Sequence, residues 1–139
     1  MSLYRHHLPQ LHGGLFLADA GLETDLIFNH GVEIREFAAH TLLPSVSGRS
    51  ALAHYFRGFL ELARLNNAGF VIDCPTWKAH RHWANDLGSS VAELREANAA
   101  AVRFAAGLRD EFPANAQPIL LNAVIGPRGD AYSPEGTLS

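Results

Sequence analysis

The 139-residue sequence contains a single cysteine, Cys74, and only one of its eleven basic residues, Lys78, is a lysine. One cysteine can form no internal disulfide and cannot supply a zinc site built mainly from thiolates. The net charge of −3 lacks the clustered basic surplus that phosphate contacts require, which argues against a nucleic-acid partner. The glycines form neither a G-x-G-x-x-G nor a Walker pattern, so a phosphate-cradling nucleotide site is not predicted.

Long apolar runs are missing as well. No segment approaches the roughly 20 apolar residues that a membrane helix needs, and residues 1–7 lack the apolar middle of a secretory signal. We therefore expect a soluble, cytoplasmic protein with no membrane partner. Hydrophobic residues nevertheless make up 47% of the chain and charged residues 18%, a balance typical of a chain that buries a core.

Short apolar runs alternate with amphipathic segments along the chain. Such alternation is typical of βαβ units that build a parallel sheet covered by helices. After a polar lead-in over residues 1–12, buried strands are predicted at 15–18, 70–72 and 118–125. Helices are predicted over 22–30, from a cap at Ser47 or Ser50 to Gly69, over 78–87 with Gly88 as its stop, and from a Ser90–Glu93 capping box to just before Pro113.

Both long helices have a clear core-facing side. The apolar residues follow the i, i+3, i+4, i+7 spacing of a helix that packs on a core. In the first helix these are Leu52, Tyr55, Phe56, Phe59, Leu60 and Ala63, and in the second they are Val91, Leu94, Ala97, Ala101, Ala105 and Leu108.

Three strands are too few for a complete parallel sheet, because both faces must be buried and the edges protected. Residues 133–139 also resemble the approach to a helix N-cap that no helix follows. The sequence therefore predicts an α/β fold that is the N-terminal portion of a larger one, with residues 1–12 as lead-in and residues 13–139 as a partial domain.

Polar clusters follow each predicted strand, at residues 19–24, 73–77 and 122–130. In parallel α/β folds the ligand binds beyond the carboxyl ends of the strands, where these clusters lie. Asp19, the first of them, could bind a ligand or could be a solvated carboxylate that caps the following turn. The residues alone leave both interpretations open.

Other side chains near the strand ends have a structural interpretation beside a functional one. Cys74 could be a nucleophile or ligand, but a small residue packed under the sheet is the favoured interpretation. His80 and His82 have a possible ligand spacing, yet no nearby carboxylate or thiolate completes a site, which favours a solvated helical turn. Trp77 and Trp83 could roof a pocket or pack a helix against the sheet.

Three segments, in order, resemble motifs of the homocysteine S-methyltransferase family. The opening D-G-G-L-E-T motif of that family is similar to residues 17–24, LADAGLET. Its second-strand segment, I-T-T-N-T-Y-Q-A or D-T-P-T-W-R-A, is similar to residues 70–79, FVIDCPTWKA. Its third-strand S-I-G-P-x-G motif is similar to residues 123–130, AVIGPRGD.

The resemblance implies a (β/α)8 barrel, the TIM barrel, of which this chain supplies the first three strands with their helices. It also implies zinc held by three cysteines, and Cys74 matches none of them. Zinc is therefore expected in the complete protein, with no metal ligand and no catalytic residue in this chain. The zinc would convert the thiol of homocysteine to a thiolate, which attacks an electrophilic methyl group. That reaction belongs to methionine biosynthesis.

Site residues carry over from the family position by position. The resemblance assigns Asp19 to the ammonium group of homocysteine, with Glu23 and Thr24 beside it, and Thr76 to the pocket wall. Two departures bear on the substrate: Ala20 replaces a motif glycine, and Pro75 replaces the usual asparagine. The acceptor could therefore be another thiol or a selenol.

The prediction is a zinc-dependent thiol methyltransferase, expected to be inactive as this chain alone because the zinc ligands are missing from it. Its partners would be a small-molecule thiol, a methyl donor, and the rest of the barrel or a second chain. One alternative is a non-catalytic half-barrel that works through self-association or a partner, since three strands leave open edges. The other is a metal-free barrel enzyme with Asp19 and Asp73 as acid–base carboxylates.

Overall fold

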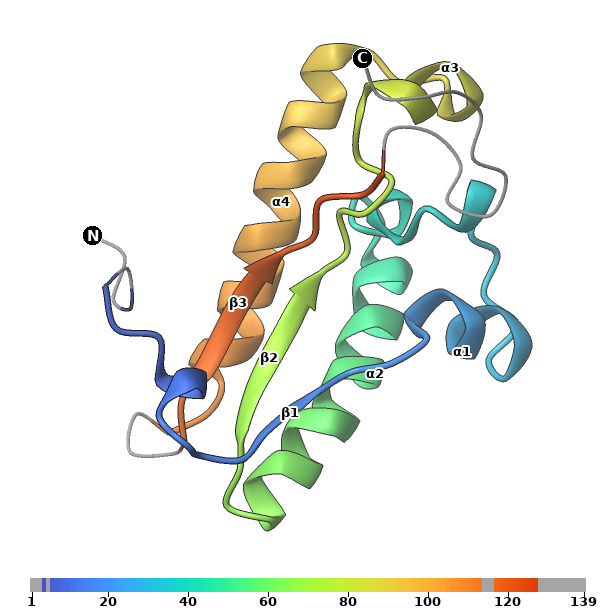
Figure 1. Cartoon of the computed structure of the whole chain (residues 1–139). Coiled ribbons are helices and arrows are strands. Elements are labelled where there is room, and N and C mark those ends of the chain that lie inside the picture. The colour runs from blue at the N-terminus through green and yellow to red at the C-terminus, as the bar shows by residue number, and fades with distance from the viewer. Residues whose placement is uncertain (1–3, 5, 114–116, 128–139) are drawn as a thin grey trace.

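The computed structural model describes residue 4, residues 6–113 and residues 117–127 of the chain. Three parallel strands in the order β1-β2-β3 form one open sheet, so the predicted α/β fold of strands alternating with helices is confirmed (Figure 1). Residues 128–139, with the end of the third motif and the expected N-cap approach, lie outside the described residues. The strands are β1 (Phe16–Ala18), β2 (Gly69–Cys74) and β3 (Ile119–Ala123), and the helices are α1 (Leu22–Phe28), α2 (Val46–Leu65), α3 (Ala84–Leu87) and α4 (Val91–Asp110).

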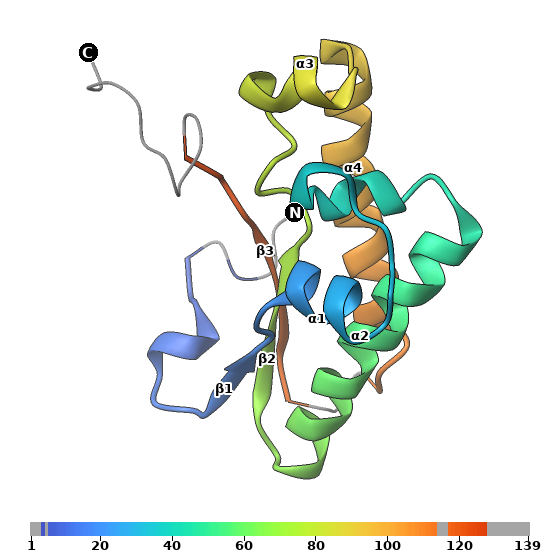
Figure 2. The ribbon, with the colours of Figure 1, turned by 90° about the vertical axis from the view of Figure 1, so that its right-hand side faces the viewer.

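The long helices cover only one face of the sheet. Figure 2 shows α1, α2 and α4 on one side and the N-terminal segment on the other. Within the described part of the chain, β1 and β3 each pair along one edge only, because both have β2 as their partner. Parallel sheets are usually covered on both faces. Association through the uncovered face or the open edges stays a prediction.

The core lies between the sheet and the two long helices. Leu52, Phe56 and Leu60 of α2 are at most 2% exposed, and they form one cluster with Phe70 and Ile72 of β2. In α4, the side chains that enter this cluster are mostly small, which lets the helix lie close to the sheet: Ala101, Ala105 and Leu108. The predicted inward faces are confirmed except at Ala97, which is half-buried and outside the core cluster, and at Val91, which is exposed because it is the first residue of α4 and lies beyond the core.

Several predicted boundaries are wrong: α1 ends at Phe28 and not at residue 30, β3 spans Ile119–Ala123 and not 118–125, and two further differences have local reasons. Strand β2 continues to Cys74, because Asp73 still pairs with Asn122 and only Pro75 interrupts the ladder. The helix expected from Lys78 begins later, because His80 is extended, with φ −140° and ψ 169°. A 3-10 turn over Arg81–Trp83 precedes α3, and Gly88 ends α3 with a φ of 65°, as predicted.

The cap of α2 is Ser45, so the prediction of Ser47 or Ser50 is wrong. The Ser45 side-chain oxygen accepts a hydrogen bond of 2.9 Å from the backbone N–H of Gly48. At the start of α4, by contrast, the predicted Ser90–Glu93 capping box is confirmed, with both of its bonds present.

The capping bond makes a first testable prediction. Ser45→Ala should lower the free energy of unfolding by about 1 kcal/mol, because it leaves an N-terminal amide of α2 without its acceptor. Ser50→Ala, inside the same helix, is the matched control and should cost nothing, since alanine is the better helix former. Urea unfolding followed by circular dichroism measures both, and equal losses would contradict the assignment of the cap.

Candidate functional site

Polar side chains lie at the carboxyl end of all three strands. Asp19 directly follows β1, Asp73 is the penultimate residue of β2, and Asn122 lies in β3. Asp73 and Asn122 are register partners, and the Asn122 amide donates a 2.7 Å hydrogen bond to Asp73 Oδ1. The parallel order thus gathers two carboxyl groups and an amide at the carboxyl ends of the strands, where ligands of α/β folds bind.

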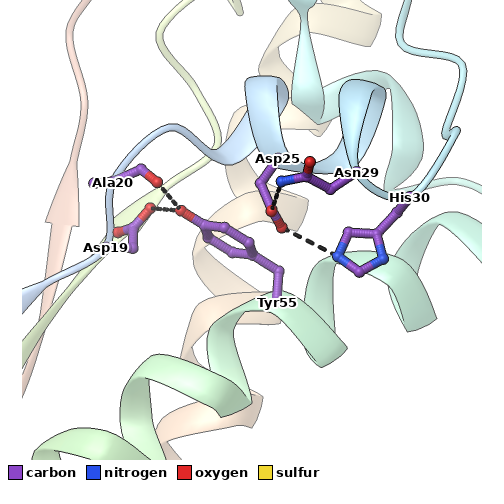
Figure 3. A network of polar contacts seen from close by, with 6 residues as sticks. All are labelled: Asp19, Ala20, Asp25, Asn29, His30 and Tyr55. Atoms are coloured by element: carbon purple, nitrogen blue, oxygen red, sulfur yellow. Dashed lines mark hydrogen bonds and ion pairs between the residues drawn. The ribbon is translucent and has the colours of Figure 1, made fainter.

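Asp19 is held from one side and unpartnered on the other. The Tyr55 hydroxyl, on α2, lies 3.2 Å from Asp19 Oδ2 and 2.8 Å from the carbonyl oxygen of Ala20, so its one proton serves both (Figure 3). Oδ1 of Asp19 is buried and has no hydrogen-bond partner among the described residues. Burial, with the charge of Asp73 as the second cause, raises the pKa of Asp19 to about 6.

A second carboxylate in the same helix–strand corner has its own partners. The Asp25 carboxylate accepts a 2.8 Å hydrogen bond from the Asn29 side-chain amide, and its other oxygen lies 3.3 Å from His30 Nε2 (Figure 3). These contacts link the first turn of α1 to its C-terminal end. Asp25 therefore stabilises the helix, whereas Oδ1 of Asp19 has no partner among the described residues.

Glu23, in the first turn of α1, accepts a 3.1 Å hydrogen bond from the indole N–H of Trp77. Burial raises the pKa of Glu23, and the amides of Glu23 itself and Ala39, the indole and the charge of Lys78 act against that rise. The first and second polar clusters of the sequence are thus joined by a direct contact. Glu23 already carries a partner in this arrangement.

The two threonines assigned by the resemblance have different positions. Thr24 is exposed on α1 and takes no part in these contacts. Thr76 is buried, and its hydroxyl donates a 2.7 Å hydrogen bond to the carbonyl oxygen of Val124 beyond β3. Its hydrogen bond ties the ends of β2 and β3 together, and its proton is engaged in doing so.

The two tryptophans enclose the only lysine of the chain. Lys78 Nζ lies 3.6 Å from the centre of the Trp83 ring and 5.1 Å from that of Trp77, a cation–π arrangement. Lys78 is 7% exposed. Trp83 is buried in a small cluster with Ala38 and Leu87 that is separate from the core on the sheet, so it packs α3 onto the α1–α2 connection and does not pack a helix against the sheet.

Cys74 and the histidines provide no metal centre. Cys74 is 1% exposed within the core, and burial raises the pKa of its thiol to about 11, so the packed interpretation is confirmed. The ring of His80 is stacked beside that of His82. Burial lowers the pKa of both His40 and His80, and a neighbouring histidine is the second cause in each case. Across the part of the chain that the structure describes, no three His, Cys, Asp or Glu side chains are placed to hold a metal ion.

Two surface hollows lie away from the strand ends. One, of about 390 Å³, lies between α2 and α4, and another, of about 140 Å³, is lined by Phe70, Phe112 and Ile119 at the opposite end of the sheet. Neither includes Asp19, Glu23 or Trp77. At the strand ends Asn122 is exposed and Asp19 and Asp73 are half-buried, while Oδ1 of Asp19 is fully buried.

Comparisons of the chain with protein-family models, curated proteins and solved structures find no match. The family resemblance therefore rests on the three sequence segments. Of the helices described, none is both long enough and apolar enough to cross a membrane.

Sequence reasoning missed two contacts near the candidate site. Tyr55 was assigned to the core face of α2, and it is 6% exposed there, but its hydroxyl reaches Asp19. A tyrosine among phenylalanines and leucines on a core face is the signal, because a buried hydroxyl needs a partner. The second contact is the hydrogen bond from Lys78 Nζ to the carbonyl oxygen of Glu36. Its signal was similar, since a lone lysine beside a buried strand end is seldom buried without a specific acceptor.

Proposed function

We propose that this chain is the N-terminal part of a (β/α)8-barrel thiol methyltransferase of the homocysteine type, and that it supplies the binding site for the ammonium group of the acceptor. The observation that carries the proposal is the carboxyl group of Asp19. It lies beyond β1, it is largely buried, and one of its oxygens has no partner in the described chain. Such a carboxylate is well suited to pair with a cationic group.

The spatial relation of the three motif segments supports the proposal. Glu23 of the first segment accepts a hydrogen bond from Trp77 of the second. The carbonyl of Trp77 closely approaches Gly126 of the third, where a Cβ would lie 1.8 Å from that oxygen. The residues that resemble the family thus meet around one tryptophan at the carboxyl ends of the strands.

The residues described here do not fit the zinc that the family uses. They include no triad of metal ligands, and the one thiol is buried with a raised pKa. We derive no step through zinc for this chain. Its share of the reaction is to bind and orient the acceptor through Asp19.

A binding experiment tests the proposal on the chain as it stands. We expect L-homocysteine to shift the amide NMR signals of Asp19 and Glu23, and 4-sulfanylbutanoate, which lacks the ammonium group, to bind at least about tenfold more weakly. Asp19→Asn should remove this preference. Equal binding of the two thiols, or no binding of either, would contradict the proposal.

In the complete coding sequence we expect one cysteine and then a Cys-Cys pair after Ser139.

A second candidate function is supported by the position of Asp73. Its charge is the second cause of the raised pKa of Asp19, and two carboxyl groups whose environments differ are typical of acid–base catalysis. In that case a metal-free barrel enzyme would use Asp19 as the proton donor. Activity that is lost in Asp73→Asn and is insensitive to chelators would favour this candidate over the methyltransferase.

A further inference from the structure

The connection between α1 and α2 contains two adjacent residues in an unfavourable backbone conformation. Glu36 and Phe37 have φ values of 51° and 54°, in the left-handed region that side chains other than glycine and asparagine rarely adopt. Such conformations persist only where surrounding contacts hold them, and they gather at functional sites. We call residues 35–40 the strap.

Two neighbouring side chains hold the strap at these strained residues. Lys78 Nζ donates a 2.6 Å hydrogen bond to the carbonyl oxygen of Glu36, and the Trp77 indole donates one of 3.2 Å to that of Phe37. Arg35 reaches the carbonyl of Asp86 at 3.3 Å. Figure 2 shows the strap region close below α3. Backbone strain is therefore opposed by donors from the segment that follows β2.

The strap lies against Glu23. The indole N–H of Trp77 is shared between Glu23 Oε1, at 3.1 Å, and the carbonyl of Phe37. The amide of Ala39 in the strap also stabilises the Glu23 carboxylate. Glu23 is four residues from Asp19, in the same corner of the fold. Opening of the strap would expose Glu23 beside the candidate ammonium site.

We propose that the strap is a strained lid over Glu23 that Trp77 and Lys78 latch shut. The ligand class it admits is a cation such as the ammonium group of an amino-acid thiol, and this part of the inference rests on the proposed function. When the ammonium group held by Asp19 also pairs with the neighbouring Glu23, that carboxylate is satisfied, and the indole N–H of Trp77 then donates its hydrogen bond to the carbonyl of Phe37 alone. Ligand binding then tightens the lid.

Hydrogen exchange of the ligand-free chain tests the latch. The reporters are the amides of Ala38 and Thr41, which donate within the strap and next to it. Lys78→Met keeps the apolar stem and removes the donor, and we expect these two amides to exchange about tenfold faster while α4 amides are unchanged. The matched control is Arg81→Met, which removes an exposed cation from the same segment and should change neither set.

A second variant separates strain from general damage. Glu36→Gly in the Lys78→Met background relieves the left-handed residue and should restore part of the protection. Unchanged exchange in Lys78→Met, or acceleration that spreads equally to α4, would overturn the lid. Because these measurements need no ligand, they stand apart from the methyltransferase proposal. Failure of L-homocysteine to bind would count against that proposal alone, whereas binding that leaves strap exchange unchanged would overturn the tightening.

Discussion

Asparagine in place of Asp19 is expected to make the fold more stable at pH 7.5 by about 1–2 kcal/mol. The pKa of Asp19 rises from 3.8 to about 6 on folding, and each unit of such a shift corresponds to about 1.4 kcal/mol. We expect about half of the free energy that this shift implies, because the carboxyl group is partly accessible and solvent screens its charge. Asparagine keeps an oxygen for the hydroxyl of Tyr55 and carries no charge toward Asp73.

The gain in unfolding free energy from Asp19→Asn should disappear at low pH. Because the folded-state pKa is the higher one, the proton on Asp19 stabilises the fold below about pH 4, and this stabilisation is lost as the pH rises through about 6. Wild type and Asp19→Asn should therefore have similar unfolding free energies at pH 4 and differ at pH 7.5. Urea unfolding at the two pH values measures this difference.

A neighbouring carboxylate provides the control for this experiment. Asp25→Asn changes a residue whose carboxylate already has partners in Asn29 and His30, so we expect no gain in stability at either pH. A gain of equal size in both variants would mean that any lost negative charge stabilises this chain, whose net charge is −3. A loss in Asp19→Asn at pH 7.5 would show that the ionised carboxylate is structural.

The same substitution should weaken binding of a cationic ligand by about tenfold to a hundredfold, since it removes the charge that pairs with the ammonium group. Ligand affinity of the wild type should rise with pH through about 6, as Asp19 loses its proton. A residue whose removal stabilises the fold but abolishes binding is one that the fold carries for function. Isothermal titration with L-homocysteine at pH 5.0 and 7.5 separates the two effects.

The backbone path of the sheet could be predicted because it depends on short-range patterns. The apolar runs before Asp19 and Asp73 are strands, and the spacing of Leu52, Phe56 and Leu60 locates the core face of α2. Ends of elements were less predictable. Ser45 caps α2 although Ser47 and Ser50 are equally good capping residues in sequence, because the choice depends on where the preceding turn ends.

The candidate site was only partly predictable for a related reason. The order of a parallel sheet follows from the chain, so the strand-end residues Asp19 and Asp73 could be grouped. The strap could not be found, because the left-handed conformation of Glu36 and Phe37 is imposed by Lys78 and Trp77, about 40 residues away. Contacts between distant segments leave no periodic signal in the sequence.

Alanine in place of Gly126 is expected to cost about 1–3 kcal/mol of unfolding free energy, through overpacking at the end of β3. A Cβ at this position would lie 1.8 Å from the carbonyl oxygen of Trp77 and 3.3 Å from His80 Nε2. The first of these is a backbone atom that cannot rotate away. The chain beyond β3 must therefore separate from the segment beyond β2.

The matched control for this change is Gly58→Ala in α2, where a new Cβ would meet nothing within 4 Å. There we expect a gain of about 0.5–1 kcal/mol, because alanine favours the helix. Urea unfolding distinguishes the two, and equal free energies would contradict the close approach.

Separation of the two segments would also strain the hydrogen bond from Thr76 to Val124 and shift Trp77, which holds both Glu23 and the strap. Loss of Gly126 should therefore raise hydrogen exchange in the strap, far from it in sequence.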